Sequence, residues 1–167
     1  MPTFPQLDLF HLRGQYNFIE PASLGYIKDR DRVAGFQSHQ FRSMPEVGDW
    51  RARGEKPPKE RWTVARLELV SLLKHDRPAV YISEELPRME QLGKAKTRTL
   101  DEFEAETLKR LQKGEDVVAD AAVNHIRLIG SLRAAKQCQQ CHAVSRGALL
   151  GAFTYDLQRV PPRDIKK

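Results

Sequence analysis

The sequence predicts a mainly α-helical fold, in which a long irregular N-terminal arm precedes a helical core with at most one short β element. Prolines interrupt residues 1–61, and apolar residues recur with helical spacing between residues 99 and 135. The composition, 40% hydrophobic and 30% charged, is typical of a soluble protein. At 167 residues the chain suits a single domain, 1–167, with the arm at 1–61 and the core at 62–167.

The arm is rich in residues that break regular structure. Its prolines are Pro2, Pro5, Pro21, Pro45, Pro57 and Pro58. Aromatic and aliphatic side chains are nevertheless spread through it, whereas disordered tails are poor in them. We therefore expect an extended arm that wraps around the core, with a short helix at about residues 21–29.

Residues 62–75 open the core with a run of aliphatic side chains. Their spacing favours a largely buried helix, although a strand is the alternative because the run is short. Pro78 ends this element, and the alternation in residues 79–83 then indicates a short strand.

Residues 99–113 carry the clearest helical pattern. Thr99 and Glu102 have the spacing of a capping box, and Gly114 is well placed to end the helix. A second helix is expected over residues 115–135, where apolar residues form a stripe and Asp116 faces outward. Two helices joined at Gly114 would form an αα-hairpin.

The stretch Cys138-Gln139-Gln140-Cys141-His142 follows this predicted hairpin and contains both cysteines of the chain. A CxxCH sequence is the attachment signature of c-type haem, and in these five residues the chain resembles the c-type cytochromes. The resemblance implies one covalent haem c, bound through Cys138 and Cys141, with His142 as the proximal iron ligand. In the familiar small cytochromes the motif lies near the start of the chain. Here it comes late, so the resemblance covers the cofactor and not the whole fold.

Three other interpretations of the two cysteines stay open, namely a zinc site, a thioredoxin-like redox pair and inert thiols. A structural zinc site draws on four Cys or His ligands, and no second pair follows. A redox CxxC normally lies where a strand enters a helix, whereas a helical pattern precedes this one. These arguments favour haem.

The sixth iron ligand has to come from upstream, because no methionine follows His142. The favoured candidate is His39, which lies between Phe36 and Phe41, followed by Met89 and His11; an open position is the alternative. The other upstream residues with suitable donors are Met44, His75 and His125. On a continuous helix His125 would lie about 25 Å from His142, and His75 is expected at a charged helix end.

Further contacts with the haem are expected from residues close to the motif. Arg133 and Arg146 flank it and could pair with the haem propionates, and Tyr155 could pack on the porphyrin. The sequence thus indicates a monohaem electron-transfer protein or domain. A haem sensor or peroxidase-like enzyme with an open sixth position, or a non-haem CxxC module, is the alternative. Whether the protein is an enzyme stays open.

The chain is basic, with a formal net charge of +6 and an isoelectric point near 9.5. Its lysines and arginines are dispersed among acids, so we expect an acidic redox partner and no nucleic acid. No apolar run is long enough for a transmembrane segment. Attachment of c-type haem implies an extracytoplasmic, periplasmic location, although the N-terminal residues lack the pattern of a signal peptide. The sequence does not fix the oligomeric state.

Overall fold

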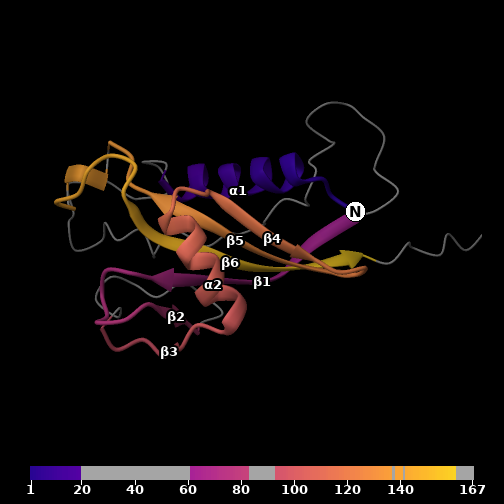
Figure 1. Cartoon of the computed structure of the whole chain (residues 1–167), viewed down its shortest axis with the longest axis horizontal. Coiled ribbons are helices and arrows are strands. Elements are labelled where there is room, and N and C mark those ends of the chain that lie inside the picture. The colour runs from indigo at the N-terminus through magenta and orange to yellow at the C-terminus, as the bar shows by residue number, and fades with distance from the viewer. Residues whose placement is uncertain (20–60, 83–92, 137, 141, 161–167) are drawn as a thin grey trace, which may run out of the picture.

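The computed structural model describes residues 1–19, 61–82, 93–136, 138–140 and 142–160, with the backbone alone for 16–19 and 140. These residues form an antiparallel six-stranded sheet of order β3-β2-β1-β6-β5-β4, with a helix packed on each face (Figure 1). The strands are β1 (Arg61–Ser71), β2 (Ala79–Tyr81), β3 (Thr97–Arg98), β4 (Val117–Ala121), β5 (His125–Arg133) and β6 (Leu149–Val160). The helices are α1 (Phe4–Ile19) and α2 (Glu102–Gln112).

The predicted mainly α fold is wrong, and the error is largest in residues 115–135. These residues form the antiparallel pair β4 and β5, so neither the helix predicted at 115–135 nor the αα-hairpin is formed there. Both faces of β5 are covered, with Ile126 and Leu128 packing on the α1 side and Ile129 on the α2 side. A strand buried on both faces carries apolar residues at almost every position, and such a run also satisfies helical spacing.

The segment at 62–75 shows the same ambiguity. The alternative interpretation as a strand is correct, because residues 61–71 form β1. Leu69 packs in the cluster under α1, and its neighbour Val70 packs in the cluster under α2. The predicted short strand at 79–83 is confirmed as β2.

Helix α2 confirms the predicted helix at 99–113, although its capping box begins two residues later than predicted, at Asp101 and not at Thr99. Asp101 is the N-cap, and its side chain accepts a hydrogen bond from the Glu104 backbone N–H. The Glu104 carboxylate accepts one in return from the Asp101 N–H, which completes the box. Gly114 follows the helix with a φ of 108°, a left-handed conformation that favours glycine.

Helix α1 corrects the expectation of an irregular arm for residues 4–19. Pro5 lies in the first turn, where an N–H has no intrahelical partner, so this proline does not break the helix. The Gln6 side chain accepts a hydrogen bond from the Thr3 backbone N–H at 2.8 Å, which stabilises the start of the helix. The expected helix at 21–29 lies outside the described residues.

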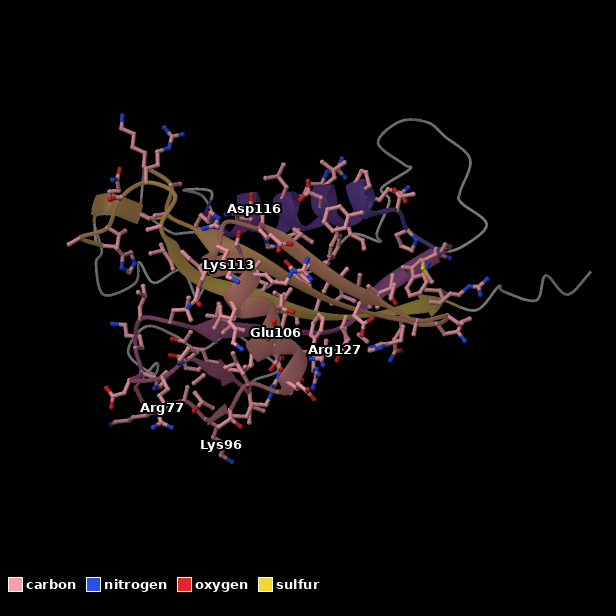
Figure 2. All side chains as sticks on the ribbon, in the orientation of Figure 1. Arg77, Lys96, Glu106, Lys113, Asp116 and Arg127 are labelled. Carbon is pink, nitrogen blue, oxygen red and sulfur yellow. The ribbon has the colours of Figure 1, made fainter. Side chains whose placement is uncertain are left out.

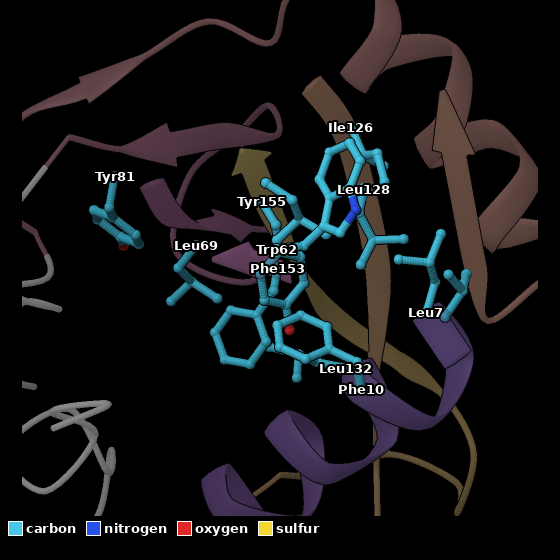
Figure 3. Packing of buried hydrophobic residues seen from close by; sticks show 12 residues of the cluster. Leu7, Phe10, Trp62, Leu69, Tyr81, Ile126, Leu128, Leu132, Phe153 and Tyr155 are labelled. Atoms are coloured by element: carbon cyan, nitrogen blue, oxygen red, sulfur yellow. The ribbon is translucent and has the colours of Figure 1, made fainter. Parts of the chain in front are cut away.

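The core consists of one apolar cluster on each face of the sheet. The cluster under α1 holds most of the large buried side chains (Figure 3). Its members are Leu7, Phe10, Trp62, Leu69, Tyr81, Val117, Ile126, Leu128, Leu132, Phe153, Tyr155 and Leu157. The smaller cluster includes Leu111 of α2 and the buried sheet residues that face it. No helix in the described ranges is long and apolar enough to cross a membrane, which agrees with the prediction from the sequence.

A charged network ties α2 to the sheet. The side chain of Glu104 is fully buried, and its carboxylate accepts hydrogen bonds from Arg98 at 2.7 and 2.8 Å. Arg98 also pairs with the buried Glu68 at 2.6 Å, and Thr154 donates to Glu104 at 3.1 Å. Burial raises the pKa of Glu104, but the hydrogen bonds from Arg98 and from the Asp101 backbone outweigh it, so the net shift is downward.

Candidate functional site

The CxxCH motif lies in the loop of residues 134–148, which joins β5 to β6 at one end of the sheet (Figure 1). Two backbone hydrogen bonds of 2.8 Å close the base of this loop, from Ala134 N–H to the Ala148 carbonyl and from Gly147 N–H to the Ala134 carbonyl. Gly147 has a φ of 85°, a left-handed conformation that glycine adopts without strain. The motif thus lies at the end of the sheet where β5 ends and β6 begins.

Within this loop the described residues of the motif begin with a tight helical turn. Residues Cys138–Gln140 are the 3₁₀ helix η3, and the His142 N–H donates to the Cys138 carbonyl at 2.9 Å. This bond spans four residues and brings the beginning and the end of the motif together. Cys138 is half-buried and forms no disulfide with the described residues, while Cys141 lies outside them.

His142 differs from the other histidines whose surroundings are described. The ring of His11 binds Tyr155 and the Ser131 carbonyl, His75 binds the Tyr81 hydroxyl at 3.2 Å, and His125 lies 3.3 Å from Asp156. No residue in the described ranges forms a hydrogen bond with the imidazole of His142, which is half-buried.

The candidates for the sixth ligand occupy separate places. His125 begins β5, and the motif follows the other end of that strand, about 25 Å away at roughly 3.3 Å per residue. His125 is therefore remote from His142 on a strand and not on the helix that the sequence predicted. His75 lies in the β1–β2 loop, also not at a helix end. His39, Met44 and Met89 lie outside the described residues, which contain no group of three metal-binding side chains.

The sequence suggested Arg133 as a partner of a haem propionate. In the structure its guanidinium has partners within the protein. It donates to Asp116 at 2.7 Å and to the carbonyls of Leu111 and Glu115 at 2.8 and 3.0 Å. A longer bond of 3.4 Å reaches the Gly147 carbonyl. Arg133 therefore fastens the end of α2 to the base of the motif loop. The hydrogen bond from Arg133 lowers the pKa of Asp116.

Asp116 was missed as a site residue, because the sequence placed it on the outer face of a helix. Its carboxylate accepts hydrogen bonds from both Ser131 and Arg133, which lie near the end of β5, before the motif loop. The sequence contains one signal that could have found it. Gly114-Glu115-Asp116 follows the helix, and a glycine beside acidic residues indicates a turn. Arg146, in contrast, is exposed beside the motif and has no ion pair with the described residues, so its predicted role stays a prediction.

Tyr155 and His11 form a buried pair between β6 and α1, and Tyr155 therefore lies in the core. The two nitrogens of His11 lie 3.0 Å from the Tyr155 hydroxyl and 2.9 Å from the Ser131 carbonyl. Burial lowers the pKa of His11 and so favours the neutral ring, and it raises the pKa of Tyr155. Because a carbonyl only accepts, Nε2 carries the proton of the neutral ring, and the Tyr155 hydroxyl donates to Nδ1.

This pair predicts a specific loss of stability in acid. Because the folded-state pKa of His11 is lowered, the unfolded chain binds a proton first as the pH falls below about 6.5. The free energy of unfolding should then fall by about 1.4 kcal/mol per pH unit until the folded-state pKa is reached. Urea denaturation from neutral to acid pH measures the slope. His11→Gln is the control, and an equal slope in the variant excludes His11 as its cause.

The comparisons leave the motif as the main guide to function. Family models, curated proteins and solved structures give no match to this chain. Three features of the chain bear on its function: the five-residue motif, the turn at its start, and the ring of His142, which has no hydrogen-bond partner among the described residues.

Proposed function

We propose that this protein is a monohaem c-type cytochrome-like electron-transfer protein. The haem would be attached through Cys138 and Cys141, with His142 as the proximal ligand. The observation that carries the proposal is the CxxCH motif on a helical turn, with a histidine whose imidazole has no hydrogen-bond partner among the described residues. When bound, the haem iron would supply a one-electron redox couple.

The residues present fit the requirements of this cofactor. Thioether formation needs an accessible thiol, and Cys138 is half-buried in a loop and not part of the core. The hydrogen bond from His142 N–H to the Cys138 carbonyl holds the histidine on the same turn as the thiol. The hydrogen bonds of Arg133 to Asp116 and to the carbonyls of Leu111 and Gly147 join the base of the loop to the end of α2 and the start of β4. An extracytoplasmic location follows from the proposal, because c-type haem is attached outside the cytoplasm in bacteria.

An acidic redox partner is part of the same proposal. Lys136 and Arg146 are exposed on the motif loop, and Lys74 and Arg77 are exposed on the β1–β2 loop. Both loops lie at one end of the sheet, since Ser71 pairs with Gly151 across β1 and β6 (Figure 2 shows Arg77 at this end). These four cations have no ion pair with the described residues, and they would attract an acidic surface.

A haem sensor or peroxidase-like enzyme with an open sixth position is the second candidate. It is supported by the hydrogen bonds of the other described histidines, since His11, His75 and His125 all have protein partners. A sixth ligand from the protein would then come from residues outside the described ranges, His39 and Met89 being the candidates from the sequence.

Expression with the c-type haem maturation machinery tests the proposal. We expect a mass increase of one haem, a pyridine haemochrome spectrum after denaturation, and loss of both in the double variant Cys138→Ser/Cys141→Ser. His125→Gln is the matched control and should keep the haem, because His125 lies at the far end of β5. A colourless protein of unmodified mass rules out the proposal.

The spin state then separates the two candidates. A six-coordinate low-spin spectrum in both oxidation states supports electron transfer. A high-spin ferric spectrum, together with ready binding of carbon monoxide by the reduced protein, supports the sensor or enzyme instead.

A further inference from the structure

His11 is a titratable residue buried in the contact between α1 and the sheet. Only 2% of it is exposed, and its neighbour Phe10 packs in the cluster under α1 that Figure 3 shows. Nε2 lies 2.9 Å from the Ser131 carbonyl, and Nδ1 lies 3.0 Å from the Tyr155 hydroxyl. Because protein groups occupy both nitrogens, His11 is not free to serve as the sixth iron ligand.

The arrangement around His11 does not accommodate a second proton on the ring. Protonation makes Nδ1 a donor, so the Tyr155 hydroxyl has to accept from it. The hydroxyl hydrogen then needs another acceptor, and Tyr155 is fully buried with no further hydrogen-bond partner among the described residues. The ring also lies so close to Gly130 that a Cβ there would overlap it, so it cannot turn away. A positive charge and an orphaned hydroxyl would both be buried, which is unfavourable.

The groups around the ring favour its neutral form on balance. Burial lowers the pKa of His11, although the Ser131 carbonyl and the carboxylates of Asp8 and Asp116 act in the opposite direction. Asp8 lies one turn earlier on α1 and is exposed, and Asp116, which precedes β4, already pairs with Arg133. The members of the cluster under α1 carry no charge. No cation or anion in the cluster therefore offsets the effect of burial.

The two helices depend on different groups for docking. A helix on the face of a sheet is joined to it by side chains, whereas neighbouring strands share backbone hydrogen bonds. Helix α2, on the opposite face from α1 (Figure 1), is held by the ion pairs of Arg98 with Glu104 and Glu68. Although burial acts against it, hydrogen bonding to Arg98 lowers the pKa of Glu104, so these pairs persist in mild acid. Mild acid thus acts on the contact of α1 and not on that of α2.

We propose that His11 is an acid-sensitive switch, whose protonation releases α1 from the sheet while α2 and the six strands stay folded. In the released state His11 is exposed and binds a proton near pH 6.5, so this state gains in population as the pH falls below that value. Release uncovers the face of the sheet that carries Tyr155, whose ring lies 5.5 Å from that of Phe10 when α1 is docked. The switch does not depend on haem.

Hydrogen exchange of the full chain, followed by mass spectrometry from about pH 7.5 to about pH 5, tests the switch. The protection of residues 4–15, corrected for the intrinsic pH dependence of exchange, should fall about tenfold per pH unit below about pH 6.5, because release binds one proton. The protection of α2 and β5 should change less than about twofold. Constant protection of α1 overturns the proposal, as does loss of protection in α1 and α2 together.

Neutral substitutions identify the titrating group. His11→Gln and His11→Asn place an amide near Nε2 and near Nδ1, respectively, and neither side chain takes up a proton. In both variants the protection of α1 should be independent of pH, even where the substitution lowers it at every pH. His125→Gln is the matched control and should keep the wild-type profile, because His125 lies beside Asp156 at the start of β5. A pH-dependent fall that persists in either His11 variant overturns the proposal, and so does a flat profile in His125→Gln.

Discussion

Replacing Arg98 by methionine is expected to lower the free energy of unfolding by about 3–5 kcal/mol at neutral pH. The guanidinium of Arg98 pairs with Glu104 and Glu68, whose side chains are 0% and 7% exposed. Methionine fills much of the same volume but removes the nearest cation of both carboxylates, which keep only the longer contacts with Arg127 at 3.6 Å and with Arg66 at 4.0 Å. A buried carboxylate that loses its main cation costs far more than the net value of the intact pair. Urea denaturation at pH 7 measures the difference.

Two comparisons separate this effect from a general loss of surface charge. Lys109→Met removes the partner of Glu106 in a pair with both side chains about two-thirds exposed, so it should cost less than about 1 kcal/mol. Because the pKa of Glu104 is lowered in the fold, its contribution is present above the unfolded pKa of about 4.3 and is lost as the pH falls through the folded-state pKa. The Arg98→Met deficit should therefore shrink in acid. A deficit at pH 7 no larger than that of Lys109→Met contradicts the prediction.

The second large effect is expected at Gly130, where α1 meets β5. A Cβ at this position would lie inside the van der Waals envelope of the His11 ring, against Nδ1 and the adjacent carbons. The ring has little freedom to move, because both of its nitrogens are hydrogen-bonded. Gly130→Ala should therefore destabilise the protein by about 3 kcal/mol or displace α1 from the sheet. Thermal and urea unfolding measure the loss.

A double-mutant cycle identifies the cause. His11→Ala by itself leaves a cavity and loses the bond from Tyr155, but it also creates room for a Cβ at position 130. Adding Gly130→Ala to that variant should cost little, which gives a coupling energy of opposite sign to the single losses. Gly93→Ala is the matched control, since nothing lies within 4 Å of a Cβ there. Strict additivity of the two substitutions would falsify the steric explanation.

The elements that were predictable from sequence depend on local signals. Helix α2 has an N-cap, a partner for it three residues later, and Gly114 at its end, and these act within one or two turns of the chain. The strand β5 has no such signal. Its burial on both faces arises from α1 and α2, which are distant in sequence, so Ile126 and Ile129 fit a helix equally well. For α1, Pro5 indicated a break, whereas its position in the first turn makes it compatible with the helix.

The candidate site, too, could be predicted from the sequence only in part. The CxxCH motif is a contiguous pattern, so Cys138, Cys141 and His142 could be proposed without a structure. The loop that carries it and the partners of Arg133 depend on residues from α2 and β4, which adjacent sequence does not reveal. Tyr155 was expected beside a porphyrin because it follows the motif closely, but each strand residue takes its neighbours from across the sheet. Its partner His11 comes from the other end of the chain.

The strand order also limits when each strand can pair during folding. The central pair of the sheet joins β1 to β6, with Trp62 opposite Arg159 and Ser71 opposite Gly151. Contacts between segments so distant in sequence form slowly, because a long stretch of chain must be ordered before they stabilise anything. Until β6 is in place, β1 and β5 are both unpaired edges that can join other chains. The motif loop precedes β6, so its thiols emerge from the ribosome before the sheet can close.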